Sequence, residues 1–364
     1  MANSDLKKAK KEKNDEFYTQ LQDIVDEIAQ HSDYVKQFEG KTVLMNCDDP
    51  EWSSFVEFFR KFFKKLKLKK IIATHYNSDG SPSYKLEWYG EKIHGDTVNM
   101  IKTPLKGNGD FRSEECIELL KEADILCSNP PFSLFRAYIE LVMKYNKKFL
   151  VIGNMNAITY KEVFPLIKEN KLWAGYGFNM SMIYKTPYPN TLESNRKYVI
   201  SHGYNPDEGY VKVPAICWFT NLDIDKRHEP LILTKNYKGN EDRYPKYDNY
   251  DAINCDKVAD IPKDYFGIVG VPISYLDKYV PSQFSIIGIG NSRDNFSPNK
   301  TYINAIKHKK DGTEVNGNAI NCVLAIQTEE KPINQVYYTS ENSKYLLSPY
   351  ARILIQRVPE KKEE

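Results

Sequence analysis

Four consecutive residues, Asn129, Pro130, Pro131 and Phe132, combine groups that could hold an amino group. Each proline fixes its φ angle and removes one N–H donor. The segment therefore keeps two rigid acceptors, the Asn129 side-chain oxygen and the Pro130 carbonyl, beside the flat ring of Phe132. Two acceptors and a ring suit the exocyclic amino group of a planar base, because that group carries two N–H donors. An ordinary strand-to-helix turn is the alternative interpretation.

The surrounding residues predict the elements that must position this segment. A short apolar strand over 124–128 precedes it, and helical spacing over 133–146 follows it. Strands and helices alternate from about 40 to 220, which predicts a doubly wound α/β sheet. In such a sheet, ligands bind at the carboxyl ends of the strands, where this segment lies. The other predicted strands are 41–46, 70–76, 149–153 and 215–221, and the other predicted helices are 20–38, 52–66 and 114–122.

The chain divides into three predicted regions. Residues 1–14 are rich in lysine and are expected to form a basic, mobile arm. Residues 15–235 carry the α/β pattern. Beyond a boundary near 235 the sequence becomes polar and rich in tyrosine, and residues 236–364 are expected to form a smaller region of strands and loops.

Charge is concentrated in clusters, although the formal net charge is only +2. Seven of the eleven residues over 60–70 are basic. Within this run, Lys64, Lys65 and Lys67 are predicted to face the phosphates of a nucleic acid, and a solvated helix face is the alternative.

Composition excludes several classes of protein. None of the six cysteines forms a CxxC pair and the six histidines do not cluster, which indicates a reduced, cytoplasmic protein with no metal site. No apolar run reaches about 18 residues, and the N-terminus is polar. We therefore expect neither a membrane span nor a secretory signal peptide.

Longer segments than the four-residue motif resemble a known family, the EcoRI-type adenine-N6 DNA methyltransferases. The resemblance rests on DEFYTQ at 15–20, NCDDP at 46–50, GDFRS at 109–113, SNPPFSLFR at 128–136, ITYKEVFPLIKENK at 158–171 and YPKYDNYDAIN at 244–254. It implies a Rossmann-like sheet that binds S-adenosylmethionine (SAM), followed by a smaller C-terminal target-recognition region. The order of the motifs, with the cofactor motifs first, matches the gamma arrangement of such enzymes.

The resemblance also implies roles for individual residues. Asn129, Pro130, Pro131 and Phe132 resemble the catalytic loop. Residues that resemble cofactor-binding motifs are Phe17, Tyr18 and Thr19 at the methionine end of SAM, Asn46, Cys47, Asp48, Asp49 and Pro50 in the first strand-to-helix loop, and Asp110 with Phe111 at its adenine.

Two departures from the family pattern concern the cofactor. The first loop lacks the usual glycine-rich sequence, and the second strand ends in Thr74-His75-Tyr76 without the acid that usually holds the SAM ribose. Asp48 or Asp49 is expected to take this role. Each of them could instead be an acid at a helix N-terminus.

The implied function is methyl transfer from SAM to a flipped-out adenine in double-stranded DNA. The implied protein acts as a monomer without a metal, and a cognate restriction endonuclease is a candidate partner. Transfer to cytosine N4 is the nearest competing reaction, and Asn rather than Ser at position 129 favours adenine. An enzyme that acts on RNA or on a protein glutamine is a further candidate, as is an inactive protein that binds DNA or SAM.

Overall fold

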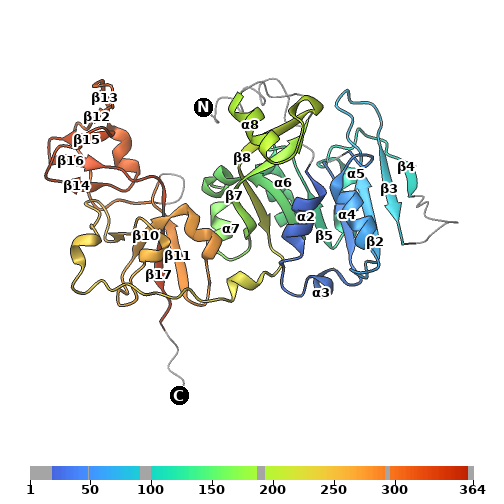
Figure 1. Cartoon of the computed structure of the whole chain (residues 1–364), viewed down its shortest axis with the longest axis horizontal. Helices are drawn as coiled ribbons and strands as arrows, with labels where there is room; N and C mark the ends of the chain where they lie inside the picture. The colour runs from blue at the N-terminus through green and yellow to red at the C-terminus, as the bar shows by residue number, and fades with distance from the viewer. Residues whose placement is uncertain (1–18, 48, 91–99, 187–192, 292–295, 360–364) are drawn as a thin grey trace, which may run out of the picture. The chain divides into compact units, whose positions relative to one another are not determined.

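The computed structural model describes residues 19–47, 49–90, 100–186, 193–291 and 296–359. The chain folds into two compact units (Figure 1). Unit 1 comprises Met1–Ile158 and Leu172–Asp225, and unit 2 comprises Thr159–Lys171 and Lys226–Glu364. No helix in the described ranges is long and apolar enough to cross a membrane.

Unit 1 is built on a mixed sheet of eight strands in the order β4-β3-β2-β1-β5-β6-β8-β7. Its centre is parallel: β1 pairs with β2 and β5, and β5 pairs with β6. The central strands are β1 (Thr42–Met45), β2 (Lys70–Thr74), β5 (Ile125–Ser128) and β6 (Lys148–Asn154). The predicted α/β arrangement is confirmed for this centre, whereas both sides of the sheet are antiparallel.

The antiparallel strands extend the sheet at both sides. On one side, β3 (Tyr84–Trp88) pairs with β2 and with β4 (Ile101–Pro104). On the other side, β8 (Tyr210–Thr220) pairs with β6 and with β7 (Trp173–Lys185). The strand predicted at 215–221 is the second half of β8.

The helices of unit 1 begin where the sequence supplies caps. Ser53 caps α4 (Ser54–Phe62) by accepting a hydrogen bond from the Val56 amide, and Ser113 caps α5 (Glu114–Glu122) in the same way. The helix predicted over 114–122 is confirmed. The helix predicted over 20–38 is instead two helices, α2 (Leu21–Ile28) and α3 (Tyr34–Phe38), because Asp33 between them has a left-handed backbone with φ 39°. Two further helices are α6 (Phe135–Lys144) and α8 (Glu193–Ser201).

The central strands are buried on both faces, as parallel strands covered by helices are. Alternate residues of β1 and β2, including Val43, Met45 and Ile71, pack in one cluster with Phe55 and Phe59 of α4 and with apolar residues of α2. On the pattern of alternation, the residues between them face the opposite side. There α5 contacts β1, and α6 contacts β6.

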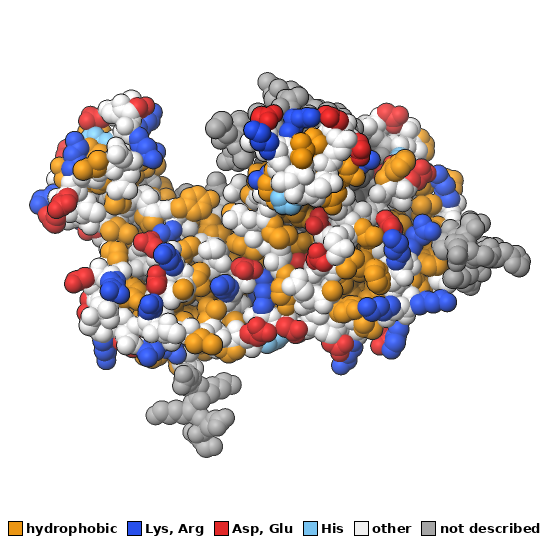
Figure 2. All heavy atoms as spheres, in the orientation of Figure 1, with side chains coloured by type: hydrophobic (Ala, Val, Ile, Leu, Met, Phe, Trp, Pro, Cys, Tyr) orange, Lys and Arg blue, Asp and Glu red, His pale blue; other side chains and the backbone are white. Residues whose placement is uncertain are grey.

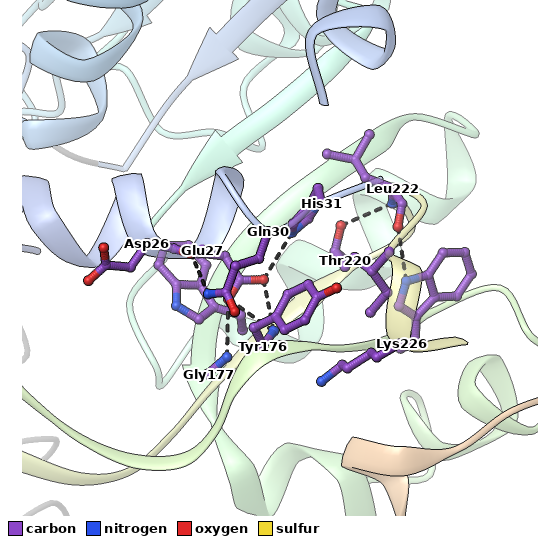
Figure 3. A network of polar contacts seen from close by, with 12 residues as sticks. Asp26, Glu27, Gln30, His31, Tyr176, Gly177, Thr220, Leu222 and Lys226 are labelled. Atoms are coloured by element: carbon purple, nitrogen blue, oxygen red, sulfur yellow. Dashed lines mark hydrogen bonds and ion pairs between the residues drawn. The ribbon is translucent and has the colours of Figure 1, made fainter. Parts of the chain in front are cut away.

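A buried acid joins α2 to the sheet. Both carboxylate oxygens of Glu27 accept from the Tyr176 amide at 3.0 Å, Oε2 also accepts from the Gly177 amide at 3.1 Å, and Oε1 lies 3.0 Å from Nε2 of His31. Figure 3 shows this carboxylate between the His31 ring and the β7 backbone. A Cβ at Gly175 would collide with it, so glycine is required at this position.

The described residues of unit 2 form two antiparallel-rich sheets, several 3-10 helices and the α-helix α7 (Phe164–Lys168), whose first turn contains Pro165. A proline in the first turn disturbs no helical hydrogen bond, so the helix starts there and does not kink. The four-stranded sheet contains β11 (Phe284–Ile289), β17 (Arg352–Arg357), β10 (Val269–Pro272) and β9 (Ile253–Asn254). The five-stranded sheet contains β13 (Glu314–Asn316), β12 (Ile306–His308), β15 (Tyr337–Ser340), β16 (Ser343–Leu347) and β14 (Ile326–Thr328).

Candidate active site

Several polar residues, among them the predicted site residues Asn46 and Asn129, lie at the ends of strands that finish at the same edge of the sheet. Asn46 follows β1, His75 follows β2, Asn129 follows β5, and Asn154 is the last residue of β6. Because these four strands are parallel, their carboxyl ends lie together. Asn46 and Asn129 are almost fully buried there.

The loop after β5 is a tight connection into α6. The Leu134 amide donates to the Pro131 carbonyl at 2.8 Å, which closes the turn before the first residue of the helix. Asn129 and Pro130 are buried, whereas Phe132 is half-buried and packs against the core cluster beneath the sheet edge. The two acceptors predicted from the sequence therefore belong to a fixed turn, with an aromatic ring beside it.

Tyr138 connects three segments that the sequence suggested separately. Its hydroxyl, on α6, donates to Oδ1 of Asn46 at 2.5 Å. Its ring makes an edge contact with the Phe111 ring, with 5.1 Å between centroids. The first cofactor loop, the Asp110-Phe111 segment and the helix after the catalytic loop thus share one buried contact point. Tyr138 lies within the helical spacing predicted over 133–146, and no sequence signal indicated this bridging role.

Cys47 explains how the first loop turns without glycine. Its φ is 78°, in the left-handed region that non-glycine residues seldom adopt. The turn that a glycine would make in other nucleotide-binding loops is therefore present here with a cysteine.

Asp49 places a carboxylate at the end of β2, although no acidic residue directly follows this strand in the sequence. Its Oδ2 lies 3.9 Å from Nε2 of His75, the residue after β2. Its Oδ1 accepts from the Glu51 amide at 2.9 Å and its carbonyl accepts from the Ser53 amide at 2.8 Å, so the loop into α4 fixes its position. Pro50 is buried in the same turn. Of the other predicted cofactor residues, Phe17, Tyr18 and Asp48 lie outside the described residues.

Asp110 is held by its neighbour Arg112. The Arg112 Nε donates to Oδ1 at 2.9 Å, Nη2 donates to Oδ2 at 2.6 Å, and the Arg112 amide donates to Oδ1 at 2.8 Å. These hydrogen bonds lower the pKa of the Asp110 carboxyl below its usual range, so it is ionised at neutral pH. Phe111, between them, is buried.

Gly109 sets the distance between Asp110 and the end of β2. Its φ is 81°, and a Cβ there would collide with the carbonyl oxygen of His75. The Asn77 amide also donates to the Asn108 carbonyl at 2.8 Å, which ties the two loops together. Gly109 and Arg112 lie in the segment GDFRS that resembles the family, and the resemblance implied a role for neither of them.

The structure places the three predicted DNA-binding lysines at the other edge of the sheet. They follow α4, and the Lys67 carbonyl accepts from the Gly40 amide, just before the start of β1. Lys67 Nζ pairs with Glu39 at 2.9 Å, and Lys65 Nζ lies 5.5 Å from the centre of the Tyr34 ring. Lys64, Lys65 and Lys67 are therefore not brought together with Asn129. Their contact with DNA stays a prediction.

Two buried hydroxyl groups of unit 1, one of them on the last residue of β5, suit a polar organic ligand. Thr19 Oγ1 and Ser128 Oγ are buried and have no hydrogen-bond partner among the described residues. Buried hydroxyls without a protein partner are rare and indicate groups reserved for water or a ligand. In the same described ranges, no cluster of three or more His, Cys, Asp and Glu side chains could hold a metal ion.

Three known methyltransferases are similar to this chain over most of its length. Type II methyltransferase M.EcoRI of Escherichia coli is 46% identical over 296 residues, covering 78% of this chain and 88% of that protein. M.MpnI of Mycoplasma pneumoniae is 40% identical over 315 residues, covering 85% and 93%. M.MgeORF184P of Mycoplasma genitalium is 41% identical over 291 residues, covering 77% and 84%. No solved structure matches the chain.

The family match extends over nearly the whole sequence. The family described as the adenine-specific methyltransferase EcoRI matches residues 5–358, which include both units and every described residue of the candidate site. The chain therefore belongs to this family, and it is an adenine-specific DNA methyltransferase.

Proposed function

We propose that this enzyme transfers a methyl group from SAM to N6 of an adenine that has been flipped out of duplex DNA, at a defined sequence. One observation carries the proposal. The rigid Asn129–Phe132 turn lies at the same sheet edge as Asn46, Asp49 and Asp110, and Tyr138 joins these segments through contacts with Asn46 and Phe111.

The catalytic turn acts on the adenine amino group. The N6 lone pair is delocalised into the ring, so the nitrogen is a poor nucleophile. When the Asn129 side-chain oxygen and the Pro130 carbonyl accept the two N6 hydrogens, a pyramidal nitrogen with an available lone pair is favoured. This effect combines positioning with preorganised electrostatics. SAM supplies the methyl group from its positively charged sulfonium.

The neighbouring loops hold the cofactor in this proposal. Asp49 lies where an acid is needed for the ribose hydroxyls, and Asp110 accepts from the adenine amino group. Asn46, Cys47, Asp48 and Pro50 form the rest of the first loop, and Phe111 supports Asp110. Thr19, with Phe17 and Tyr18, contacts the methionine end. The shared edge supports the roles of Asn46, Asp49 and Asp110, and the buried hydroxyl of Thr19 supports its own role.

Phe132 receives the target base. A base stacked in a duplex cannot bring N6 to a buried turn, so it must leave the helix and stack on this half-buried ring. Unit 2 and the basic arm at 1–14 hold the duplex. In unit 2, the hairpin of β12 and β13 is exposed at its turn and carries Lys309 and Lys310 there. The protein acts as a monomer, in a restriction-modification pair with a cognate endonuclease.

Label transfer tests the proposal. The protein is incubated with tritiated SAM and duplex DNA, RNA or protein, and the labelled product is digested and identified. We expect N6-methyladenine in duplex DNA. Label in RNA, in protein glutamine or in N4-methylcytosine would contradict the proposed substrate and identify the group that is methylated instead.

The first residue to test is Asn129. Asn129→Ala should lower kcat by about 100-fold or more, because it removes an acceptor that acts mainly in the transition state. Its SAM affinity should stay within a few-fold of wild type. Asn205→Ala, which removes an amide that caps a surface turn, is the matched control and should keep full activity. Activity of Asn129→Ala close to wild type would contradict the catalytic role.

A further inference from the structure

Arg112 donates three hydrogen bonds to the Asp110 carboxylate, and these bonds fix the orientation of that carboxylate. Resting on the proposed function, we infer that Arg112 is a positioning residue that leaves the Asp110 carboxylate with one open acceptor position, and so selects a cofactor base that carries an amino group over one that carries a carbonyl.

The hydrogen bonds of the carboxylate leave one acceptor position. Each carboxylate oxygen has two lone pairs in the plane of the group. Oδ1 accepts from both the Arg112 amide and Arg112 Nε, so its two positions are filled. Oδ2 accepts only from Arg112 Nη2 among the described residues, which leaves one position. A single N–H donor, such as one hydrogen of an exocyclic amino group, fits that position.

The carboxylate has little freedom to turn another oxygen to the ligand. Asn108 Oδ1 accepts from the Asp110 amide at 3.2 Å, and Gly109 packs against the His75 carbonyl, so the backbone is fixed. The guanidinium lies 5.3 Å from the centre of the Phe111 ring, and that ring is itself buried against Tyr138. The planar fork of Arg112 therefore rests on a fixed surface and fixes the plane of the carboxylate.

The exposed fractions of the two side chains indicate that the Asp110–Arg112 ion pair contributes little to stability. The Asp110 side chain is 24% exposed and the Arg112 side chain is 52% exposed. Ion pairs with this exposure add little to stability. The consequence of the pair is therefore the orientation of a half-buried acceptor. An ionised carboxylate with one open position attracts an amino group and repels a carbonyl oxygen at the same place on the base.

Binding of two ligands tests this inference with the full-length protein. Calorimetry compares S-adenosylhomocysteine, which has a 6-amino group, with S-inosylhomocysteine, which has a 6-carbonyl. We expect wild type to prefer the adenosyl ligand by about 100-fold or more, as expected of a site built around one hydrogen-bonded polar group. Arg112→Ala should reduce this preference by about tenfold, mainly through weaker binding of the adenosyl ligand, and should raise KM for SAM while kcat at saturation is kept.

Two further variants separate orientation from charge and from general stability. Arg112→Lys keeps the positive charge but has no fork, so it should lose most of the preference too. Arg196→Ala removes an arginine that pairs with Asp207 on the surface of the same unit, and it should leave the preference unchanged. Thermal melts confirm that each variant is folded.

The outcomes are distinct. Wild-type preference retained in both Arg112 variants would overturn the inference and leave the proposed function intact. Failure of the wild-type protein to bind either ligand would overturn the proposed function, and the inference with it.

Discussion

Cys47 shows how a single backbone angle can replace a sequence motif. The first loop needs one residue in the left-handed region, and a glycine reaches it without strain. Cysteine occupies this position here, at a cost of about 1 kcal/mol or more for a non-glycine residue. A left-handed backbone, which glycine adopts most readily, is therefore present at Cys47 although the glycine-rich sequence is absent.

Replacing this cysteine with glycine should stabilise the protein. Cys47→Gly removes the strain but adds flexibility to the unfolded chain, so the net gain in the free energy of unfolding should be about 0.5–1 kcal/mol. Cys47→Ala, which keeps a Cβ at the same φ, should show no gain. Urea denaturation measures both. A gain of equal size in the two variants would indicate that the thiol, and not the backbone angle, is the unfavourable feature.

Asp23, in the first turn of α2, makes stability depend on pH. Burial and the nearby Asp26 raise the pKa of its carboxyl to about 6, against 3.8 for the free group. A raised pKa means that the native state binds the proton more tightly than the unfolded state. The contribution of Asp23 to stability is therefore full below about pH 4 and is lost as pH rises through about 6.

The variant Asp23→Asn should remove this dependence. At pH 7.5 it should be more stable than wild type by about 1–3 kcal/mol, because no charge is buried. Toward pH 4 the difference should disappear. Chemical denaturation at several pH values between 4 and 8 gives the comparison, and a difference that does not change with pH would contradict the raised pKa.

At the scale of elements, the sequence predicted those strands and helices whose residues show a regular local pattern. The strands of the parallel centre, the helix over 114–122 and the place of the catalytic turn followed from apolar runs and helical spacing. Strand β7 was not predicted, because bulges and the glycines at 175 and 177 interrupt its alternation. The Tyr138–Asn46 hydrogen bond joins residues 92 positions apart, and no local pattern reports such a contact.

Glu27 connects two of these elements, and its removal should be costly. Glu27→Ala leaves two amides of β7, one buried and one half-buried, without their acceptor and should destabilise the protein by about 2–4 kcal/mol. Glu27→Gln keeps one oxygen and should lose less. The exposed neighbour Asp26→Ala should change the free energy of unfolding by no more than about 0.5 kcal/mol. Thermal and urea unfolding test the series, and equal effects of Glu27→Ala and Asp26→Ala would contradict the anchoring role.

At the scale of the whole molecule, net charge gives little attraction for DNA. Lysines and arginines are interspersed with acidic side chains on the face in Figure 2, in agreement with the formal charge of +2. Attraction for phosphates must then come from local groups of lysines. Two such groups are Lys309 with Lys310 on the β12–β13 hairpin and the run that contains Lys64, Lys65 and Lys67.

The salt dependence of duplex binding tests these groups. Lys309→Gln with Lys310→Gln should make the negative slope of log K against log salt shallower by about 2, because each phosphate contact contributes about −0.9. Lys344→Gln removes a lysine of unit 2 that pairs with Glu329 and should leave the slope unchanged. A wild-type slope in the double variant would exclude the hairpin as a phosphate contact. The triple variant of Lys64, Lys65 and Lys67 tests the other group by the same criterion.

The path of the chain between its two units has a consequence for how such enzymes can exchange specificity. The chain leaves unit 1 after Ile158, gives thirteen residues to unit 2, returns at Leu172 and leaves again after Asp225. Those thirteen residues include α7, which contacts β11 of unit 2. A recombination event that moves only the segment after Asp225 would therefore combine α7 from one parent with a sheet from another. If unit 2 reads the target, as proposed above, a hybrid that keeps α7 with its own sheet needs two separate exchanges in one gene. New target sites should then arise more readily by point substitution within unit 2 than by transfer of the unit as one block.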